Sequence, residues 1–82
     1  MKYDIKFNYD YLLKRIEDRY KETTLNKNIN KLCKEVNYLT SLRFKNIVIN
    51  KRGYFTQNEI LKISRVLKLD HDEIIKCFLE VN

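Results

Sequence analysis

The fold of this chain depends on residues 40–53, Thr-Ser-Leu-Arg-Phe-Lys-Asn-Ile-Val-Ile-Asn-Lys-Arg-Gly. In the first interpretation, Thr40 or Ser41 caps a helix over residues 40–48, because a hydroxyl side chain can accept a hydrogen bond from a free amide at a helix start. A helix of that span places its apolar residues on one side, with the spacing that a buried helix face requires. These apolar residues are Phe44, Ile47 and Val48.

The second interpretation of the same stretch is a β-hairpin over residues 43–55. Asn-Ile-Val-Ile-Asn at 46–50 would form a strand, and Lys-Arg-Gly at 51–53 would form the turn. Three consecutive β-branched residues favour the strand locally. The stretch by itself leaves the helix and the hairpin open.

Composition favours helices. The chain has 82 residues, no proline and one glycine, Gly53, whereas small sheet proteins usually need more turn residues. It is 44% hydrophobic and 34% charged, which predicts a folded chain. We therefore expect an all-α domain of five helices that spans residues 1–82.

Two helix starts carry a capping box, in which an N-cap side chain and a Glu three residues later exchange hydrogen bonds with the backbone. Thr56 with Glu59 opens the predicted fourth helix, and Asp70 with Glu73 opens the fifth. Earlier in the chain, Asn8 is the predicted N-cap of the first helix. Each of these helices has an apolar stripe at helical spacing. The stripes are Tyr9, Leu12, Leu13, Ile16 and Tyr20; Ile60, Ile63 and Leu67, with Leu61 and Val66 at the edges; and Ile74, Ile75, Phe78 and Leu79.

The predicted second helix spans residues 28–36. Asn28 is the favoured start, with Thr24 and Asn26 as alternative caps, and Asn37 closes the helix because Asn tolerates the left-handed conformation. Its stripe consists of Leu25, Ile29, Leu32, Cys33 and Val36. Before the first helix, residues 2–7 alternate polar and apolar, which predicts a short strand or an extended arm.

The positive charge of the chain is concentrated in its middle. Residues 21–53 have a net charge of +6, against +1 for residues 1–20 and −1 for residues 54–82. Residues 40–53 contain four cations and no acid. A basic region set on an apolar framework is typical of a surface for a polyanion such as nucleic acid. The alternative is a solvated basic face without a specific partner.

Catalysis finds little support in the sequence. His71 is the only histidine, and it lies six residues from Cys77, a spacing that separates the two on a helix. Cys33 and Cys77 have no metal-binding spacing, so we expect two reduced core thiols, no metal, no cofactor and no enzymatic activity.

No segment reads as a signal peptide or a membrane span, which predicts a cytoplasmic protein without a membrane partner. Tyr38 and Tyr54 lie outside the apolar stripes and could contact a phosphate or a base.

Three segments resemble phage Cro- and repressor-type helix-turn-helix proteins. They are Phe-Asn-Tyr-Asp-Tyr-Leu-Leu-Lys-Arg-Ile at 7–16, Phe-Thr-Gln-Asn-Glu-Ile-Leu-Lys-Ile at 55–63, and Asp-Glu-Ile-Ile-Lys-Cys-Phe-Leu at 72–79. The resemblance implies a repressor-like fold and favours the helix over the hairpin at 40–48.

The resemblance also implies a function. The helix at 40–48 would enter the major groove of double-stranded DNA, and a homodimer would match an inverted repeat. Residues reading base edges would be Ser41, Arg43, Lys45 and Asn46, whereas phosphate contacts would come from Lys27, Asn28, Lys51 and Arg52. The chain would be a transcription regulator in a bacterial or phage-infected cell. The alternative is a helix-turn-helix body reused to bind a host or phage protein, for example as an inhibitor of a host nuclease similar to an anti-CRISPR protein.

Overall fold

Five helices make up the secondary structure of the computed structural model, which describes residues 7–37 and 39–81. No strand occurs in these two ranges, so the all-α prediction is confirmed. The helices are α1 (Asp10–Tyr20), α2 (Leu25–Val36), α3 (Ser41–Val48), α4 (Gln57–Leu67) and α5 (His71–Phe78).

The stretch that decides the fold is helical. Thr40 caps α3, with its hydroxyl accepting a 3.1 Å hydrogen bond from the Arg43 amide. The hairpin alternative is therefore wrong. The local preference for a strand is overridden because the helix buries Phe44, Ile47 and Val48 on one side. Burial of a hydrophobic face of that size outweighs the preferences of single residues.

The capping predictions hold at α4 and α5, where both hydrogen bonds of each capping box are formed. The favoured start of α2 at Asn28 was three residues too late, whereas the alternative cap, Thr24, is confirmed. Thr24 is the cap, with its hydroxyl accepting from the Lys27 amide, and Asn28 lies inside the helix. Asn37 ends α2 in the left-handed conformation, as predicted. At α1, Tyr9 occupies the cap position, while the Asn8 side chain accepts a bond from the Asp10 amide.

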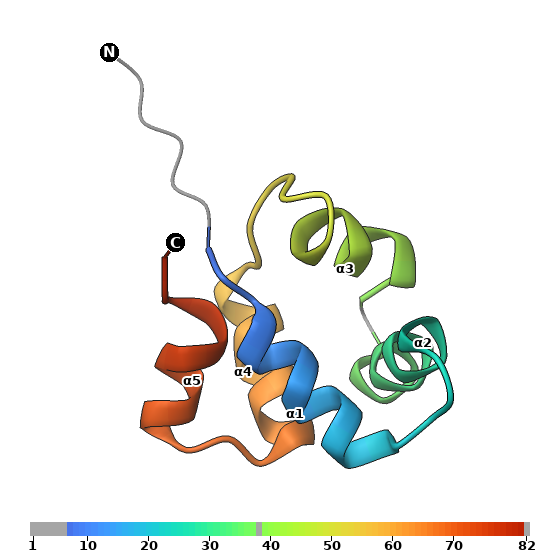
Figure 1. Cartoon of the computed structure of the whole chain (residues 1–82). Coiled ribbons are helices and arrows are strands. Elements are labelled where there is room, and N and C mark those ends of the chain that lie inside the picture. The colour runs from blue at the N-terminus through green and yellow to red at the C-terminus, as the bar shows by residue number, and fades with distance from the viewer. Residues whose placement is uncertain (1–6, 38, 82) are drawn as a thin grey trace.

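The helices pack around α1, which contacts α2, α4 and α5 (Figure 1). In turn, α4 contacts α2 and α5. The position of α3 is different, because its backbone lies close to that of α2 alone among the helices and it lies at the periphery of the molecule (Figure 1). One side of α3 is thus left facing outward.

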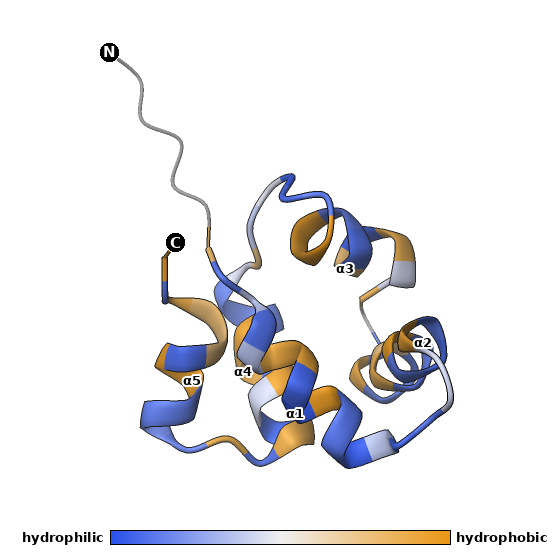
Figure 2. Cartoon of the chain, in the orientation of Figure 1, coloured by the Kyte–Doolittle hydropathy of each residue, from blue (hydrophilic) through white to orange (hydrophobic). Residues whose placement is uncertain are grey.

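The aromatic centre of the core is Phe55, in the loop before α4. The centre of its ring lies 5.6 Å from the ring centres of Tyr9, Phe44 and Phe78, which come from three different parts of the chain. These contacts connect α3 and α5 to the start of α1 through one loop residue. Aromatic pairs at this distance add to the free energy gained from burial alone. Figure 2 shows hydrophobic positions facing the interior on α1 and α4, but also near both ends of α3.

Both predicted core thiols, Cys33 and Cys77, are buried. Some stripe predictions were wrong at their edges. Leu25, Ile75 and Leu79 were expected to face the core and are exposed. In α5 the buried residues are Cys77 and Phe78, and Ile74 is partly buried against the core, so the inward side of the helix is rotated from the predicted one.

The two ends of the described chain lie side by side. The Asn8 amide donates a 2.8 Å hydrogen bond to the Glu80 carbonyl, and Phe7 forms an isolated antiparallel bridge with Val81. The predicted strand or arm at residues 2–7 falls outside the described residues except for Phe7.

Candidate functional site

The outward side of α3 is the first part of the candidate site. Successive helix residues are rotated by about 100°, so the direction opposite the buried residues falls on positions 42, 46 and 49. Leu42 is 71% exposed and Ile49 is 47% exposed, and Asn46 lies between them with partial exposure. The outermost line of α3 therefore consists of an apolar residue, an amide and a second apolar residue.

The loop after α3 turns back along the helix and forms the second part of the site. The Arg52 amide donates a 2.8 Å bond to the Asn46 carbonyl, and the Asn50 amide donates to the Lys45 carbonyl. The loop can fold back because Lys51 and Gly53 adopt positive φ angles of 56° and 78°. Between loop and helix lies an open groove of about 460 Å³. Its lining residues are Thr40, Leu42, Arg43, Asn46, Ile47, Arg52 and Gly53.

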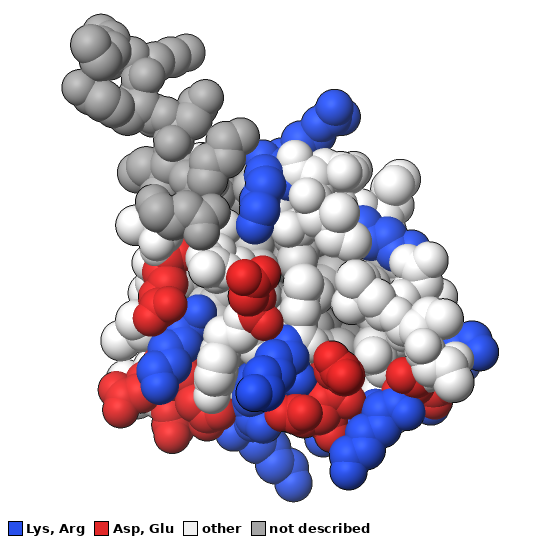
Figure 3. Space-filling model, viewed as in Figure 1, with Lys and Arg blue, Asp and Glu red and all other residues white. Residues whose placement is uncertain are grey.

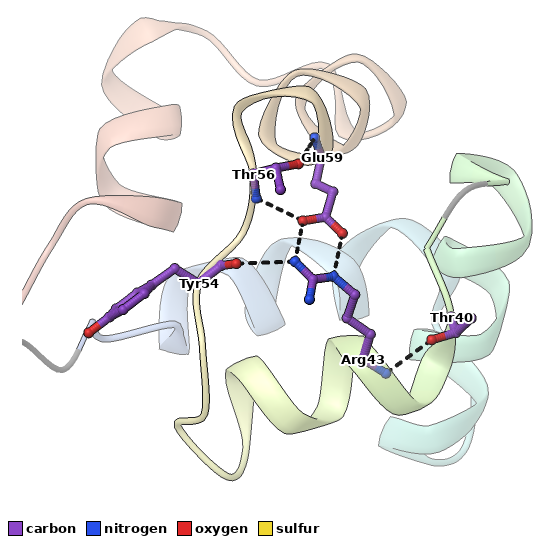
Figure 4. Close-up of polar contacts among 5 residues, drawn as sticks. All are labelled: Thr40, Arg43, Tyr54, Thr56 and Glu59. Carbon is purple, nitrogen blue, oxygen red and sulfur yellow. Dashed lines mark hydrogen bonds and ion pairs between the residues drawn. The ribbon is translucent and has the colours of Figure 1, made fainter.

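Arg43, predicted to read a base edge, is committed to a partner within the protein. Its guanidinium donates two hydrogen bonds to the Glu59 carboxylate, at 2.7 and 2.9 Å, and a third to the Tyr54 carbonyl at 3.2 Å (Figure 4). The bonds from Arg43 hold the pKa of the Glu59 carboxyl below its ordinary value. The geometry thus gives Arg43 a structural role, because these bonds join α3 to the first turn of α4. The sequence could not reveal this pair, since its members lie 16 residues apart.

Two of the predicted phosphate contacts are also occupied within the fold. Asn28 is only 3% exposed, and its side-chain oxygen accepts a 3.0 Å bond from the Glu22 amide. Asn28 therefore stabilises the approach to α2 and cannot reach a phosphate in this structure. Lys51 donates from Nζ to the Phe7 carbonyl at 3.0 Å and lies 5.1 Å from the centre of the Tyr9 ring.

The remaining predicted residues stay near the outward face. Ser41 donates its hydroxyl to the side-chain oxygen of Asn30. Lys45 is partly exposed and lies one helical turn after Ser41, on the side of α3 that meets α2. The Asn46 oxygen accepts a 3.0 Å bond from the Asn50 side chain.

Lys27 and Arg52 are the exposed cations of the predicted set that lie outside α3. Lys27 donates from Nζ to the hydroxyl of Thr23 at 3.3 Å. Among the described residues, the Arg52 side chain has no hydrogen bond or ion pair. Arg52 is therefore the guanidinium that the groove beside α3 presents to a ligand.

Charge is distributed unevenly over the surface. In Figure 3 the acidic side chains lie over the lower part of the molecule and near the C-terminal end, and none is visible over α3 or the loop after it. The sequence of this region, residues 40–53, contains no acid. Glu59 of α4 is the acid that contacts α3, and its charge is paired with that of Arg43. The α3 face is therefore positive and well suited to an anionic partner.

Sequence reasoning overlooked Leu42, the most exposed large apolar residue described. A helical projection from Phe44, Ile47 and Val48 could have found it, because Leu42 lies opposite them. Of the two tyrosines set apart by the sequence, Tyr54 is exposed and packs edge-on against the Phe7 ring. Tyr38 lies outside the described residues.

The thiols are poorly placed for nucleophilic chemistry. Burial raises the pKa of Cys33, and it raises the pKa of Cys77 to about 12. A thiol is nucleophilic as the thiolate, which burial disfavours. Among residues 7–37 and 39–81, no three His, Cys, Asp or Glu side chains gather in a way that could hold a metal ion.

In the described part of the chain, no helix combines the length and apolar character needed to cross a membrane. No family model matches this chain, and neither a curated protein nor a solved structure matches it.

Proposed function

We propose that this protein binds double-stranded DNA as a transcription regulator of the phage Cro and repressor type, with α3 in the major groove. The observation that carries the proposal is the outward side of α3, exposed along its length beside a basic loop that contains no acid. The major groove is about 12 Å wide and admits one helix. The connection from α2 to α3 then acts as the turn of a helix-turn-helix unit.

The positive charge supports this proposal. Lys45 belongs to α3, Arg52 lines the groove beside it and Lys27 is an exposed cation of α2, while a duplex carries about one negative charge per 1.7 Å of its axis. Cations near phosphates release condensed counterions, which favours binding without distinguishing sequences. Ser41, Asn46 and the groove beside them would supply the contacts to base edges.

The proposal includes a homodimer, since two-fold symmetry lets one protein occupy both halves of an inverted repeat. Ile75, Leu79 and Val81 form an exposed apolar patch at the end of the chain. Exposed apolar residues that gather on one part of a surface are typical of protein interfaces, so this patch is the proposed dimer surface.

Binding to random-sequence duplexes of about 30 base pairs at two salt concentrations tests the proposal. We expect micromolar binding at low salt and a log–log slope of about −3, because each of about three phosphate contacts contributes about −0.9. Lys14, an exposed residue of α1, provides the control, since Lys14→Ala should leave the slope unchanged. No binding at micromolar protein, or binding that salt does not weaken, would contradict DNA recognition.

A second candidate function is binding to a host or phage protein, for example as a nuclease inhibitor. The exposure of Leu42 and Ile49 favours it, because apolar residues at the centre of an exposed face are common in protein interfaces. The DNA-binding experiment separates the two, since an inhibitor of this kind needs no affinity for duplex DNA. As a DNA-binding regulator, the protein would act in the cytoplasm of a bacterial or phage-infected cell.

A further inference from the structure

The outermost line of α3 lacks the side chains that commonly read guanine. Arginine and lysine are the common readers of guanine, through its O6 and N7 acceptors. Arg43 is held by Glu59 and the Tyr54 carbonyl, and Lys45 lies one turn after Ser41, on the side of the helix that meets α2. Neither cation lies on the outermost line, where Leu42 and Asn46 stand one helical turn apart.

These two residues have the chemistry that an A·T pair presents in the major groove. Thymine offers a methyl group, and adenine offers the N7 acceptor and the N6 donor. Leu42 has a fully apolar side chain that is 71% exposed, so contact with a methyl group would remove apolar surface from water. An Asn amide can pair with N6 and N7 of adenine at the same time.

The geometry of Asn46 fits this role. Its side-chain oxygen already accepts a 3.0 Å bond from Asn50, which fixes the orientation of the amide. A carbonyl oxygen has a second lone pair, and the amide nitrogen has two donors, so the groups needed for adenine remain available. Residues four apart on a helix have Cβ atoms about 5–6 Å apart, a span of about one to two base pairs.

We infer that α3 reads A·T base pairs, with Leu42 against thymine methyl groups and Asn46 on an adenine. This inference rests on the proposed DNA-binding function and replaces the base-reading role that the resemblance implies for Arg43. Duplex DNA is favoured over a protein as the occupant of this face because the apolar line lies in a positive surface. Arg52 stands at the edge of the adjoining groove, where a guanidinium can reach the DNA backbone.

The test begins with selection of bound sites from a random duplex library. The best site is then synthesised twice, once with thymine and once with deoxyuridine, which keeps base pairing and lacks only the methyl group. One methyl group removed from an apolar contact should weaken binding about fourfold, from a transfer free energy of about 0.8 kcal/mol. Asn46→Ala should weaken binding to the selected site by about 5- to 150-fold and binding to random DNA much less.

Leu42→Ala identifies the residue that senses the methyl group. The variant should bind the thymine duplex more weakly and lose the distinction between thymine and deoxyuridine. Leu61→Ala is the matched control, since Leu61 is an exposed leucine of α4 that does not line the groove, and it should retain the fourfold difference. A circular dichroism melt of each variant checks that the fold is kept.

The outcomes separate the inference from the proposed function. Salt-dependent DNA binding with no deoxyuridine effect, or selected sites without enrichment in A·T pairs, would overturn A·T reading and leave DNA binding intact. A deoxyuridine effect that persists in Leu42→Ala would also overturn the role of Leu42. Absence of DNA binding under all conditions would reject both, and the apolar line of α3 would then be a protein-binding face.

Discussion

Arg43 of α3 forms a bidentate ion pair with Glu59, the residue that also completes the capping box of α4. One carboxylate therefore accepts hydrogen bonds from the Thr56 amide and from the Arg43 guanidinium (Figure 4). Because the backbone of α3 lies close to no helix other than α2, this pair is its polar link to α4. The position of the candidate reading helix thus depends on a contact at its side.

The pair should contribute measurably to stability. We expect Arg43→Ala to lower the melting temperature by about 4–8 °C, which corresponds to about 1 kcal/mol in a domain of this size. Glu59→Gln keeps a side chain that can serve in a capping box and removes the charge. A double-mutant cycle with these two substitutions, measured by thermal denaturation, should give a coupling free energy of about 1 kcal/mol. Strictly additive effects would mean that the ion pair does not stabilise the fold.

The same pair predicts how stability depends on pH. Hydrogen bonds from Arg43 lower the pKa of Glu59 from the ordinary value of 4.5. The unfolded chain therefore binds more protons than the folded one in this range, and the stability that Glu59 contributes is lost as pH falls through its folded pKa. The stability difference between the wild type and Glu59→Gln should be largest above pH 4.5 and should narrow as the solution is made more acidic.

The wild type and this variant share every other acid, including Glu22, whose pKa is lowered by Lys31. Their difference therefore isolates Glu59. Melting curves recorded over a pH series would test this prediction. A stability difference that widens as the pH falls would contradict it.

Lys51 and Arg52 are neighbours in the sequence, but the structure predicts different effects for them. Arg52→Ala should weaken binding to all duplexes. It should also reduce the magnitude of the log–log slope of affinity against salt concentration by about 1. Lys51→Ala should instead lower stability by about 1 kcal/mol, because Nζ is engaged with the Phe7 carbonyl and the Tyr9 ring. Arg65, an exposed arginine of α4, supplies the control substitution Arg65→Ala. Equal changes in salt slope for Lys51→Ala and Arg52→Ala would contradict this division.

The proposed dimer can be tested at α5. Ile75 is 49% exposed, and Ile75→Lys would place a charge in the proposed apolar interface without disturbing the core. We expect light scattering to give a dimer for the wild type and a monomer for the variant at the same concentration. Leu61→Lys, at an exposed leucine of α4, is the matched control and should remain dimeric. A wild-type monomer at high concentration, both with and without DNA, would remove the dimer from the proposal.

Several features of the fold follow from local sequence. The capping boxes at Thr56 and Asp70 and the left-handed end at Asn37 were predictable, because each depends on hydrogen bonds or backbone preferences within a few residues. The buried stripes of α1, α2 and α4 were also largely predictable from helical spacing. The concentration of positive charge in the middle of the chain is a property of the sequence itself.

Tertiary structure decided which side chains remain available. Arg43 and Asn28 look like surface groups in the sequence, but the fold pairs one with Glu59 and buries the other beside Glu22. The sequence determined the helices and the basic region because these depend on near neighbours and on composition. The partner of each polar side chain depends on residues brought together by packing, and that is why only the folded chain separates structural cations from those open to a ligand.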